Sequence, residues 1–238
     1  SLTEKILRCY KMEFTYDAYE NLVSKLEKYG YQFASYHDYK SFEKCVVMRH
    51  DIDYSLQKSV ELAELENQLG IQSTYFVLLS SPFYNIASKD TVKKIKKIQN
   101  TGHEIGLHFD ELNYDELDYD RIGGVEKAIY QEIDLMSSIL DCDIRLVSMH
   151  RPSPKTLQAN YDLGMIVNSY SKEFFEGFKY VSDSRRRWRE DVEEIISCGL
   201  YNKLHILTHA FWYNEIEKDI KQSILDFMDE AKEERLYF

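Results

Sequence analysis

Apolar runs and amphipathic segments alternate along most of the chain. Runs rich in β-branched and aromatic residues predict strands at 45–49, 72–79, 103–108, 144–149, 165–169, 179–182 and 204–208. Apolar positions spaced three and four residues apart predict helices at 14–28, 55–69, 91–100, 124–140, 190–196 and 214–235, with a shorter helix near 156–161. This sustained alternation is typical of a mostly parallel sheet, either open or closed as a barrel.

The domain organisation follows from what the pattern lacks. We find no internal repeat, no low-complexity tract and no linker rich in Pro, Gly or Ser. The chain has 238 residues, of which 44% are hydrophobic, and this is enough for a full core. We therefore expect one domain over 1–238, with a helical N-terminal segment to about residue 40.

The net charge of the chain bears on which binding partners it can have. A formal net charge of -11 repels phosphate backbones, which excludes a nucleic-acid-binding role. The basic cluster Arg185–Arg189 departs from this trend. Because an arginine fork matches phosphate oxygens, Arg185 is a candidate contact for a diphosphate, and a solvated loop is the alternative.

The cysteines and the lengths of the apolar stretches bear on the cellular compartment in which the protein works. The cysteines Cys9, Cys45, Cys142 and Cys198 are scattered, which excludes a zinc ribbon and predicts free thiols in a reducing environment. No stretch approaches the roughly 20 apolar residues of a membrane span. The first residues show no apolar signal-peptide core, so we expect a cytoplasmic protein.

Acids and histidines gather at the ends of the predicted strands. The first strand stops at His50-Asp51-Ile52-Asp53, which can direct Asp51 and Asp53 into the same cavity. One carboxylate could ligate a cation while the other accepts a proton from water. The alternative is that Asp53 or Ser55 caps the helix that follows.

A second cluster is the segment His103–His108. His108, at the end of its strand, is the better metal ligand, since a neutral imidazole suits an ion such as zinc. Glu104 or Asp110 could orient it. His103, near the start of the strand, is interpreted as a structural histidine with satisfied hydrogen bonds.

Three further strand ends carry polar groups. Arg151, after His150, offers a fork that can hold a carboxylate deprotonated, although an arginine beside a turn proline can also be a surface residue. Asp183 could bind an arginine or a substrate hydroxyl, or cap a helix. His209 could be a general acid beside a sugar ring stacked on Trp212, or belong to an aromatic core.

Taken in order, these motifs resemble the polysaccharide deacetylase superfamily, carbohydrate esterase family 4 and its relatives, from about Val46 to Trp212. The motifs that carry the resemblance are Asp51 with Asp53, Gly102–His108, Arg151-Pro152, Asp183 with Trp188, and Leu207-Thr208-His209. The Arg-His-Asp-Ile-Asp form is similar to an intracellular branch that includes sugar-modifying enzymes of surface-glycan pathways. The resemblance implies an α/β fold, a distorted (β/α) barrel with about seven parallel strands.

The resemblance also implies roles. Asp51 is then the general base and Arg151 orients it, Asp53 and His108 are metal ligands, and His209 is the acid that protonates the leaving amine.

One position departs from the family. The usual second metal histidine falls at Leu112, which cannot ligate an ion. His150 is our candidate replacement, because it also ends a strand, and Asp110 is the runner-up.

We therefore predict a metal-dependent deacetylase, with zinc as the favoured divalent ion, that acts on an amino sugar of a glycan or glycan precursor. Asp183, Trp212 and Arg185 are its candidate substrate-binding residues. Two alternatives stay open: a metal-independent hydrolase of a non-sugar C–N bond, and a barrel that binds a glycan or partner without catalysis. The oligomeric state is not determined by the sequence.

Overall fold

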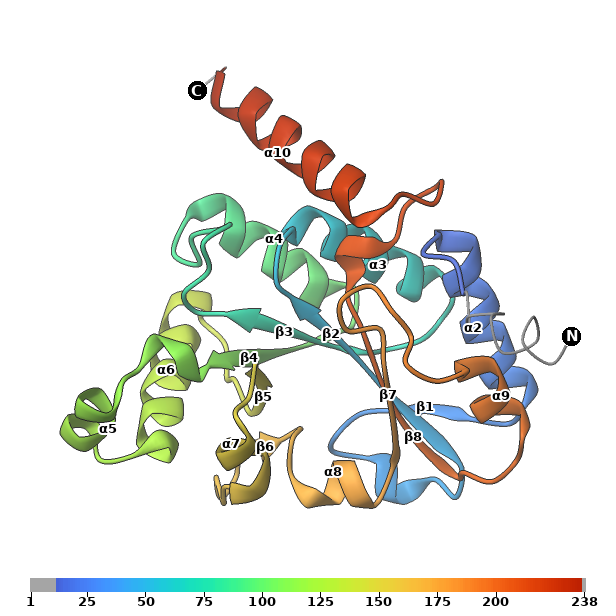
Figure 1. Cartoon of the computed structure of the whole chain (residues 1–238), viewed down its shortest axis with the longest axis horizontal. Helices are drawn as coiled ribbons and strands as arrows, with labels where there is room; N and C mark the ends of the chain where they lie inside the picture. The colour runs from blue at the N-terminus through green and yellow to red at the C-terminus, as the bar shows by residue number, and fades with distance from the viewer. Residues whose placement is uncertain (1–11, 237–238) are drawn as a thin grey trace, which may run out of the picture.

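A parallel sheet organises the chain, and the computed structural model describes it over residues 12–236 (Figure 1). Its strands are β1 (Gln32–Ala34), β2 (Cys45–Ile52), β3 (Thr74–Leu78), β4 (Glu104–Asp110), β5 (Leu146–His150), β6 (Val167–Asn168), β7 (Lys179–Ser182) and β8 (Lys203–Thr208). Seven of them follow the order β6-β5-β4-β3-β2-β8-β7. β1 shares one edge of β2 with β3, because it pairs with the first half of β2 and β3 with the second.

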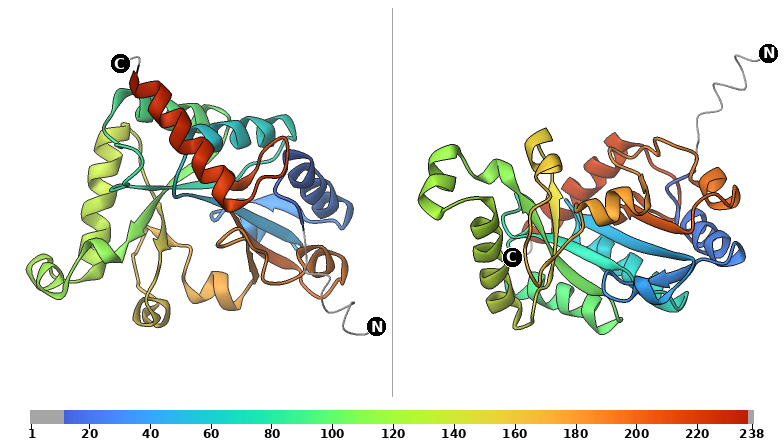
Figure 2. Two further views of the ribbon diagram at one scale, coloured as in Figure 1. Left: turned by 45° about the horizontal axis from the view of Figure 1, so that its top comes forward. Right: turned by 90° about the horizontal axis from the view of Figure 1, so that it is seen from below.

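Helices connect and cover the strands. They are α2 (Tyr16–Lys28), α3 (Leu56–Gln68), α4 (Lys89–Asn100), α5 (Glu116–Ile122), α6 (Val125–Leu140), α7 (Pro154–Ala159), α8 (Lys172–Glu176), α9 (Val192–Ser197) and α10 (Ile220–Leu236), with short 3₁₀ turns η1 (Tyr39–Ser41), η2 (Glu111–Asn113) and η3 (Ala210–Trp212). Hydroxyl side chains of Thr15, Ser55 and Ser88 accept hydrogen bonds at the starts of α2, α3 and α4, which fixes where these helices begin. The closing helix α10 runs past α3 and α4 on one side of the sheet (Figure 2). None of the helices in the described range is long and apolar enough to cross a membrane.

The sheet curls into the distorted (β/α) barrel that the sequence predicts. Arg49 of β2 reaches Ser169, which directly follows β6, although β3, β4 and β5 separate these strands in the sheet. The two end strands β6 and β7 do not pair among the described residues, so the barrel is open between them. The predicted fold class is confirmed.

Several elements differ from the predictions. The segment before residue 40 contains β1 as well as a helix; this strand is too short to show a clear period-two pattern. The helices α5 and α8 were not expected, and α5 buries none of its residues. The last helix begins at Ile220 rather than at residue 214. Cys45, Cys142 and Cys198 are free thiols as expected, whereas Cys9 lies outside the described residues.

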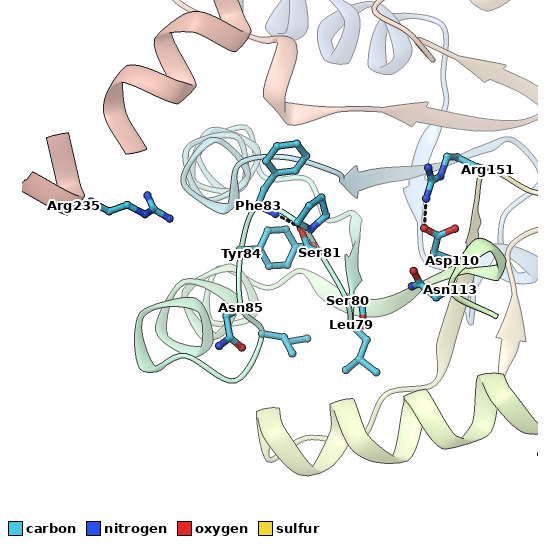
Figure 3. Close-up of a pocket in the computed structure, with 12 residues that line it drawn as sticks. Leu79, Ser80, Ser81, Phe83, Tyr84, Asn85, Asp110, Asn113, Arg151 and Arg235 are labelled. Atoms are coloured by element: carbon cyan, nitrogen blue, oxygen red, sulfur yellow. Dashed lines mark hydrogen bonds and ion pairs between the residues drawn. The ribbon is translucent and has the colours of Figure 1, made fainter. Parts of the chain in front are cut away.

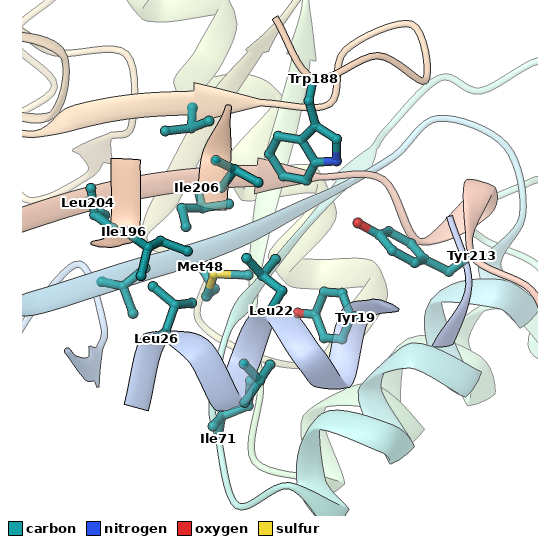
Figure 4. Packing of buried hydrophobic residues seen from close by; sticks show 14 of the residues in the cluster. Tyr19, Leu22, Leu26, Met48, Ile71, Trp188, Ile196, Leu204, Ile206 and Tyr213 are labelled. Carbon is teal, nitrogen blue, oxygen red and sulfur yellow. The ribbon is translucent and has the colours of Figure 1, made fainter. Parts of the chain in front are cut away.

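Successive side chains of β2 point alternately into the barrel and outward against the helices. All of its residues are buried, so each side chain either enters the barrel or packs against helices. Met48 faces outward, into a cluster with Leu22 and Leu26 of α2 and Ile196 of α9 (Figure 4). Arg49 and Asp51 are one step out of phase with Met48 and therefore face the barrel interior.

The outward-facing His50 joins a buried polar network centred on Glu66 of α3. The Glu66 carboxylate accepts hydrogen bonds from Tyr19 at 2.6 Å, Tyr75 at 2.8 Å and Ser73 at 2.6 Å, and it lies 2.9 Å from His50 Nε2. These contacts join α2, α3, β2 and β3. Burial alone would raise the pKa of Glu66, but its interactions with His50, His103 and Ser73 together outweigh this effect and lower the pKa to about 2.

His103 borders the same network and has the structural role expected of it. Its Nδ1 accepts a hydrogen bond from the Ser73 backbone amide at 3.1 Å, and its Nε2 lies 2.9 Å from the Ala63 carbonyl oxygen. Both nitrogens are thus engaged inside the protein.

We predict that Glu66→Gln lowers the free energy of unfolding by about 3 kcal/mol at neutral pH, because it leaves buried donors poorly matched. The pKa of Glu66 is depressed, so this stabilisation is present above pH 4.5 and is lost as the pH falls towards 2. Urea unfolding of both proteins at several pH values measures the difference.

Glu64→Gln is the matched control on the same helix. Glu64 is partly exposed and pairs with Lys97, so its loss should cost no more than about 1 kcal/mol. Equal effects of the two substitutions would contradict the importance of the buried network.

Candidate active site

The carboxyl ends of β2, β4, β5 and β8 bring five predicted residues to one edge of the barrel. These residues are Asp51, Asp53, His108, His150 and His209. Parallel strands place their carboxyl ends at the same edge, and barrel enzymes form their active sites there. The sequence therefore predicted the location of this cluster through strand ends alone.

Asp53, His108 and His150 form a candidate metal site. Asp53 Oδ1 lies 3.3 Å from His108 Nε2 and 3.4 Å from His150 Nδ1, and the two imidazole nitrogens are 3.1 Å apart. All three potential ligand atoms lie within 4.8 Å of one another. Asp53 Oδ1 is buried and has no hydrogen-bond partner among residues 12–236, as expected of an atom that would bind a cation. The donor set thus fits a divalent ion.

Neighbouring groups orient His108 and favour the neutral form of His150, as metal binding requires. His108 Nδ1 lies 2.6 Å from Ser148 Oγ, its cross-strand partner on β5, and this contact turns Nε2 towards Asp53. Burial, together with the nearby His108, lowers the pKa of His150. A lowered pKa favours the neutral imidazole that ligates metals.

Asp51 lies beside the metal site rather than in it. Its Oδ2 accepts a hydrogen bond from Arg49 at 2.8 Å and is 3.6 Å from His108 Nε2. Its Oδ1 is buried and has no hydrogen-bond partner in the described chain. Burial would raise the pKa of Asp51, but its interactions with Arg49, His108 and His209 together outweigh that effect and hold the pKa below its ordinary value. The carboxylate is therefore ionised at neutral pH and keeps one oxygen free.

His209 is oriented by Asp183. The imidazole Nδ1 lies 2.6 Å from Asp183 Oδ1, and the His209 backbone amide donates to Asp183 Oδ2 at 3.0 Å. Burial lowers the pKa of His209, but the carboxylates of Asp183, Asp53 and Asp51 together outweigh burial and raise the pKa to about 9. Nε2 points into the site, 3.6 Å from Asp53 Oδ2. Because both Asp183 oxygens serve His209, the expectation that Asp183 binds substrate is corrected: it positions the histidine.

The expectation that Arg151 orients Asp51 is wrong. Arg151 pairs instead with Asp110 at the end of β4, and its side chain is 57% exposed. Arg49 holds Asp51, since residues two apart on a strand share a face. Asp110 is occupied by Arg151 and by the Leu112 amide, so it does not join the metal site. Of the two candidates to replace Leu112 as a ligand, His150 lies in the candidate metal site and Asp110 does not.

A cavity of about 820 Å³ opens next to this ion pair (Figure 3). Arg151 and Asp110 line one end of it, and polar side chains of Ser80, Asn85 and Asn113 line its wall. No residue of the candidate metal site lines this cavity; the link between them is that Asp110 and Arg151 follow His108 and His150 by two residues and one residue along the chain. Hydroxyl-binding amide and serine groups in such a position suit a polar ligand.

Two predicted substrate contacts lie elsewhere. Trp212 is only 6% exposed and packs against Phe211 and Tyr54, so its ring offers no open platform for a sugar, and that expectation is corrected. An aromatic run after a strand can face either the core or the solvent, and the sequence alone does not decide between them. Arg185 is exposed, with a positive φ of 61°, and no contact places it in the site.

Sequence reasoning missed Arg49 and Ser148. Both could have been found by strand alternation, since Arg49 precedes Asp51 by two residues and Ser148 precedes His150 by two.

Gly106 makes room for a ring that packs on Arg49 in the barrel interior. A Cβ there would lie 2.5 Å from the Phe76 ring, so only glycine leaves room for this ring, which stacks over Arg49.

No family model and no curated protein matches the chain. Solved structures that are similar in fold include a carbohydrate esterase family 4 pseudoenzyme of Bacillus anthracis, with 14% identity over 81% of this chain and a TM-score of 0.48. The chain spans 62% of that protein.

Two other similar structures are matched over a larger share of their own length. The peptidoglycan deacetylase PdaC of Bacillus subtilis, in a mutant form, is 13% identical over 82% of this chain and 98% of its own, with a TM-score of 0.47. The chitin deacetylase of Colletotrichum lindemuthianum is 16% identical over 78% of this chain and 81% of its own, with a TM-score of 0.43.

We predict that Asp53→Ala and His150→Ala each lower zinc affinity by at least about 100-fold, because each removes one ligand atom. A competition titration against a chromogenic chelator measures this directly and needs no substrate. His37→Ala is the matched control, since His37 lies away from the site and pairs with Glu104. Unchanged affinity in both site variants would contradict the assignment.

Proposed function

We propose that this protein is a metal-dependent deacetylase of the polysaccharide deacetylase superfamily, which removes an N-acyl group from an amino sugar of a glycan or glycan precursor. One observation carries the proposal. A candidate metal triad, an ionised aspartate with a free oxygen and a histidine held by an aspartate lie around one edge of the barrel.

The ligand set favours zinc. Asp53, His108 and His150 would hold the ion, and two imidazoles with one carboxylate form a common catalytic zinc set. A cation bound there supplies Lewis acidity to an acyl carbonyl.

Asp51 is suited to act as the general base. Arg49 engages only its Oδ2, so Oδ1 can accept a proton from an attacking water. Because its pKa is held below the ordinary value, the carboxylate is available as a base throughout the neutral range.

His209 is suited to act as the general acid. Its raised pKa, about 9, keeps the imidazole protonated at neutral pH. Asp183 fixes the ring through Nδ1, which leaves Nε2–H free to donate to the nitrogen of a leaving amine. Amide hydrolysis uses a deprotonated base and a protonated acid in one site, and Asp51 and His209 have these opposite protonation states.

The substrate class rests on the resemblance of the motifs and on the polar cavity that Asp110 and Arg151 line. That cavity is large enough for sugar rings, and its serine and asparagine side chains could bind hydroxyl groups. A role in the biosynthesis of surface polysaccharide, in the cytoplasm, is part of this proposal.

The test is release of acetate or formate from a panel of N-acylated oligosaccharides, nucleotide-linked sugars and lipid-linked sugars with zinc supplied. We expect turnover of at least one of them, and a loss of roughly 10² to 10⁴ in kcat in Asp51→Asn with zinc affinity retained. Asp134→Asn, an exposed carboxylate on α6, is the control. No release from any substrate by zinc-loaded protein would overturn the proposal, and sugar binding without release would favour a non-catalytic barrel.

A further inference from the structure

Arg49 carries a charge in the middle of the barrel. Its side chain is fully buried, and it is the largest of the fully buried side chains. One guanidinium nitrogen donates to Asp51 Oδ2 at 2.8 Å, and another donates to Ser169 Oγ at 3.0 Å. The guanidinium carbon lies 5.3 Å from the Phe76 ring centre and 4.9 Å from that of Tyr170. The fork is therefore fixed from several sides.

Stability does not explain this arrangement. Removing two charges from water costs several kcal/mol, and replacing a buried ion pair by apolar side chains is often neutral or stabilising. The surrounding Phe76 and Tyr170 could pack against such an apolar residue. The buried charge of Arg49 therefore indicates a role that an apolar side chain could not fill.

The direction of the hydrogen bond indicates the task. Arg49 binds Oδ2 of Asp51 and leaves Oδ1 without a partner in the described structure. Since the plane of the carboxylate cannot turn without weakening this charge-assisted bond, one oxygen stays bound to Arg49 and the other stays free. Arg151, at the mouth of the barrel, is bound to Asp110 and has no contact with Asp51 that could replace this one.

We propose that Arg49 is the positioning residue for Asp51 and performs, from within β2, the task that the family resemblance assigns to Arg151. This inference rests on the proposed function, because it takes Asp51 as the base. Arg49 fixes the orientation in which the carboxylate presents its free oxygen to the attacking water, while Arg151 lines the cavity next to Asp110.

The test compares Arg49→Gln, Arg49→Lys and Arg151→Gln on the substrate that the wild type turns over, with rates expressed per folded, zinc-loaded molecule. We expect Arg49→Gln to lower kcat by about 100-fold, with KM and zinc affinity nearly unchanged, because a misplaced base affects the chemical step. Arg49→Lys should recover part of this loss, since it restores the charge without the fork. Arg151→Gln should lower kcat less than Arg49→Gln does and act mainly on KM.

A second variant covers the case in which Arg49→Gln does not fold. Ser169→Ala removes a hydrogen bond that fixes the guanidinium and leaves the charge in place. It should lower kcat by about 5-fold, because the net free energy of one hydrogen bond, about 1 kcal/mol, corresponds to a change of this size. KM and zinc affinity should be retained. Ser59→Ala is its control: this buried serine of α3 donates to the Ser55 carbonyl, away from the site.

The outcomes separate the two proposals. If the wild type is active and Arg49→Gln keeps the wild-type kcat, the role assigned to Arg49 is overturned, while the proposed function stands. If Arg49→Gln does not fold, an unchanged kcat in Ser169→Ala has the same meaning. A larger loss of kcat in Arg151→Gln than in Arg49→Gln also overturns this role. A zinc-loaded wild type that releases no acyl group overturns the proposed function, and with it the role of Arg49.

Discussion

The ion pair between Arg49 and Asp51, buried inside the curled sheet, is the interaction on which the arrangement of the site depends. It fixes Asp51 at the end of β2 and, through Ser169, ties β2 to the end of β6. This tie crosses the interior from the centre of the sheet to one of its end strands. The strand ends that carry the remaining site residues are thereby held around a common centre.

Strand alternation divides the polar residues of this protein into two groups with different roles. His50 and His103 lie outside the barrel wall, where Glu66 and its partners satisfy them and hold helices to the sheet. His108 and His150 lie at the rim, with Asp53 between them. A single-residue shift in strand register would exchange these groups. The buried Glu66 network therefore supports the chemistry indirectly, by fixing the register of the strands that present it.

The sequence predicted the alternation of elements, the parallel barrel and the group formed by Asp53, His108 and His150. These predictions succeed because strand ends in a parallel sheet meet at one edge whatever the details of curvature. The partner of Asp51 could not be deduced in the same way. Whether Arg151 reaches it depends on how strongly the sheet curls and on the competing carboxylate of Asp110, which are both tertiary effects.

The burial of Trp212 was equally out of reach of the sequence. Its orientation follows from packing against Tyr54 and Phe211 rather than from any local periodicity. Short elements were missed for a related reason. The strand β1 exists because β2 offers it an unpaired edge, not because its own residues favour a strand strongly.

The most direct test of the central claim is anomalous X-ray diffraction, measured at the zinc absorption edge, from crystals grown with zinc. The account predicts a zinc peak within bonding distance of Asp53, His108 and His150, with Asp51 outside the coordination sphere and still paired with Arg49. A zinc peak bound elsewhere, no peak at this edge of the barrel, or Asp51 as a ligand with Arg49 released would contradict it.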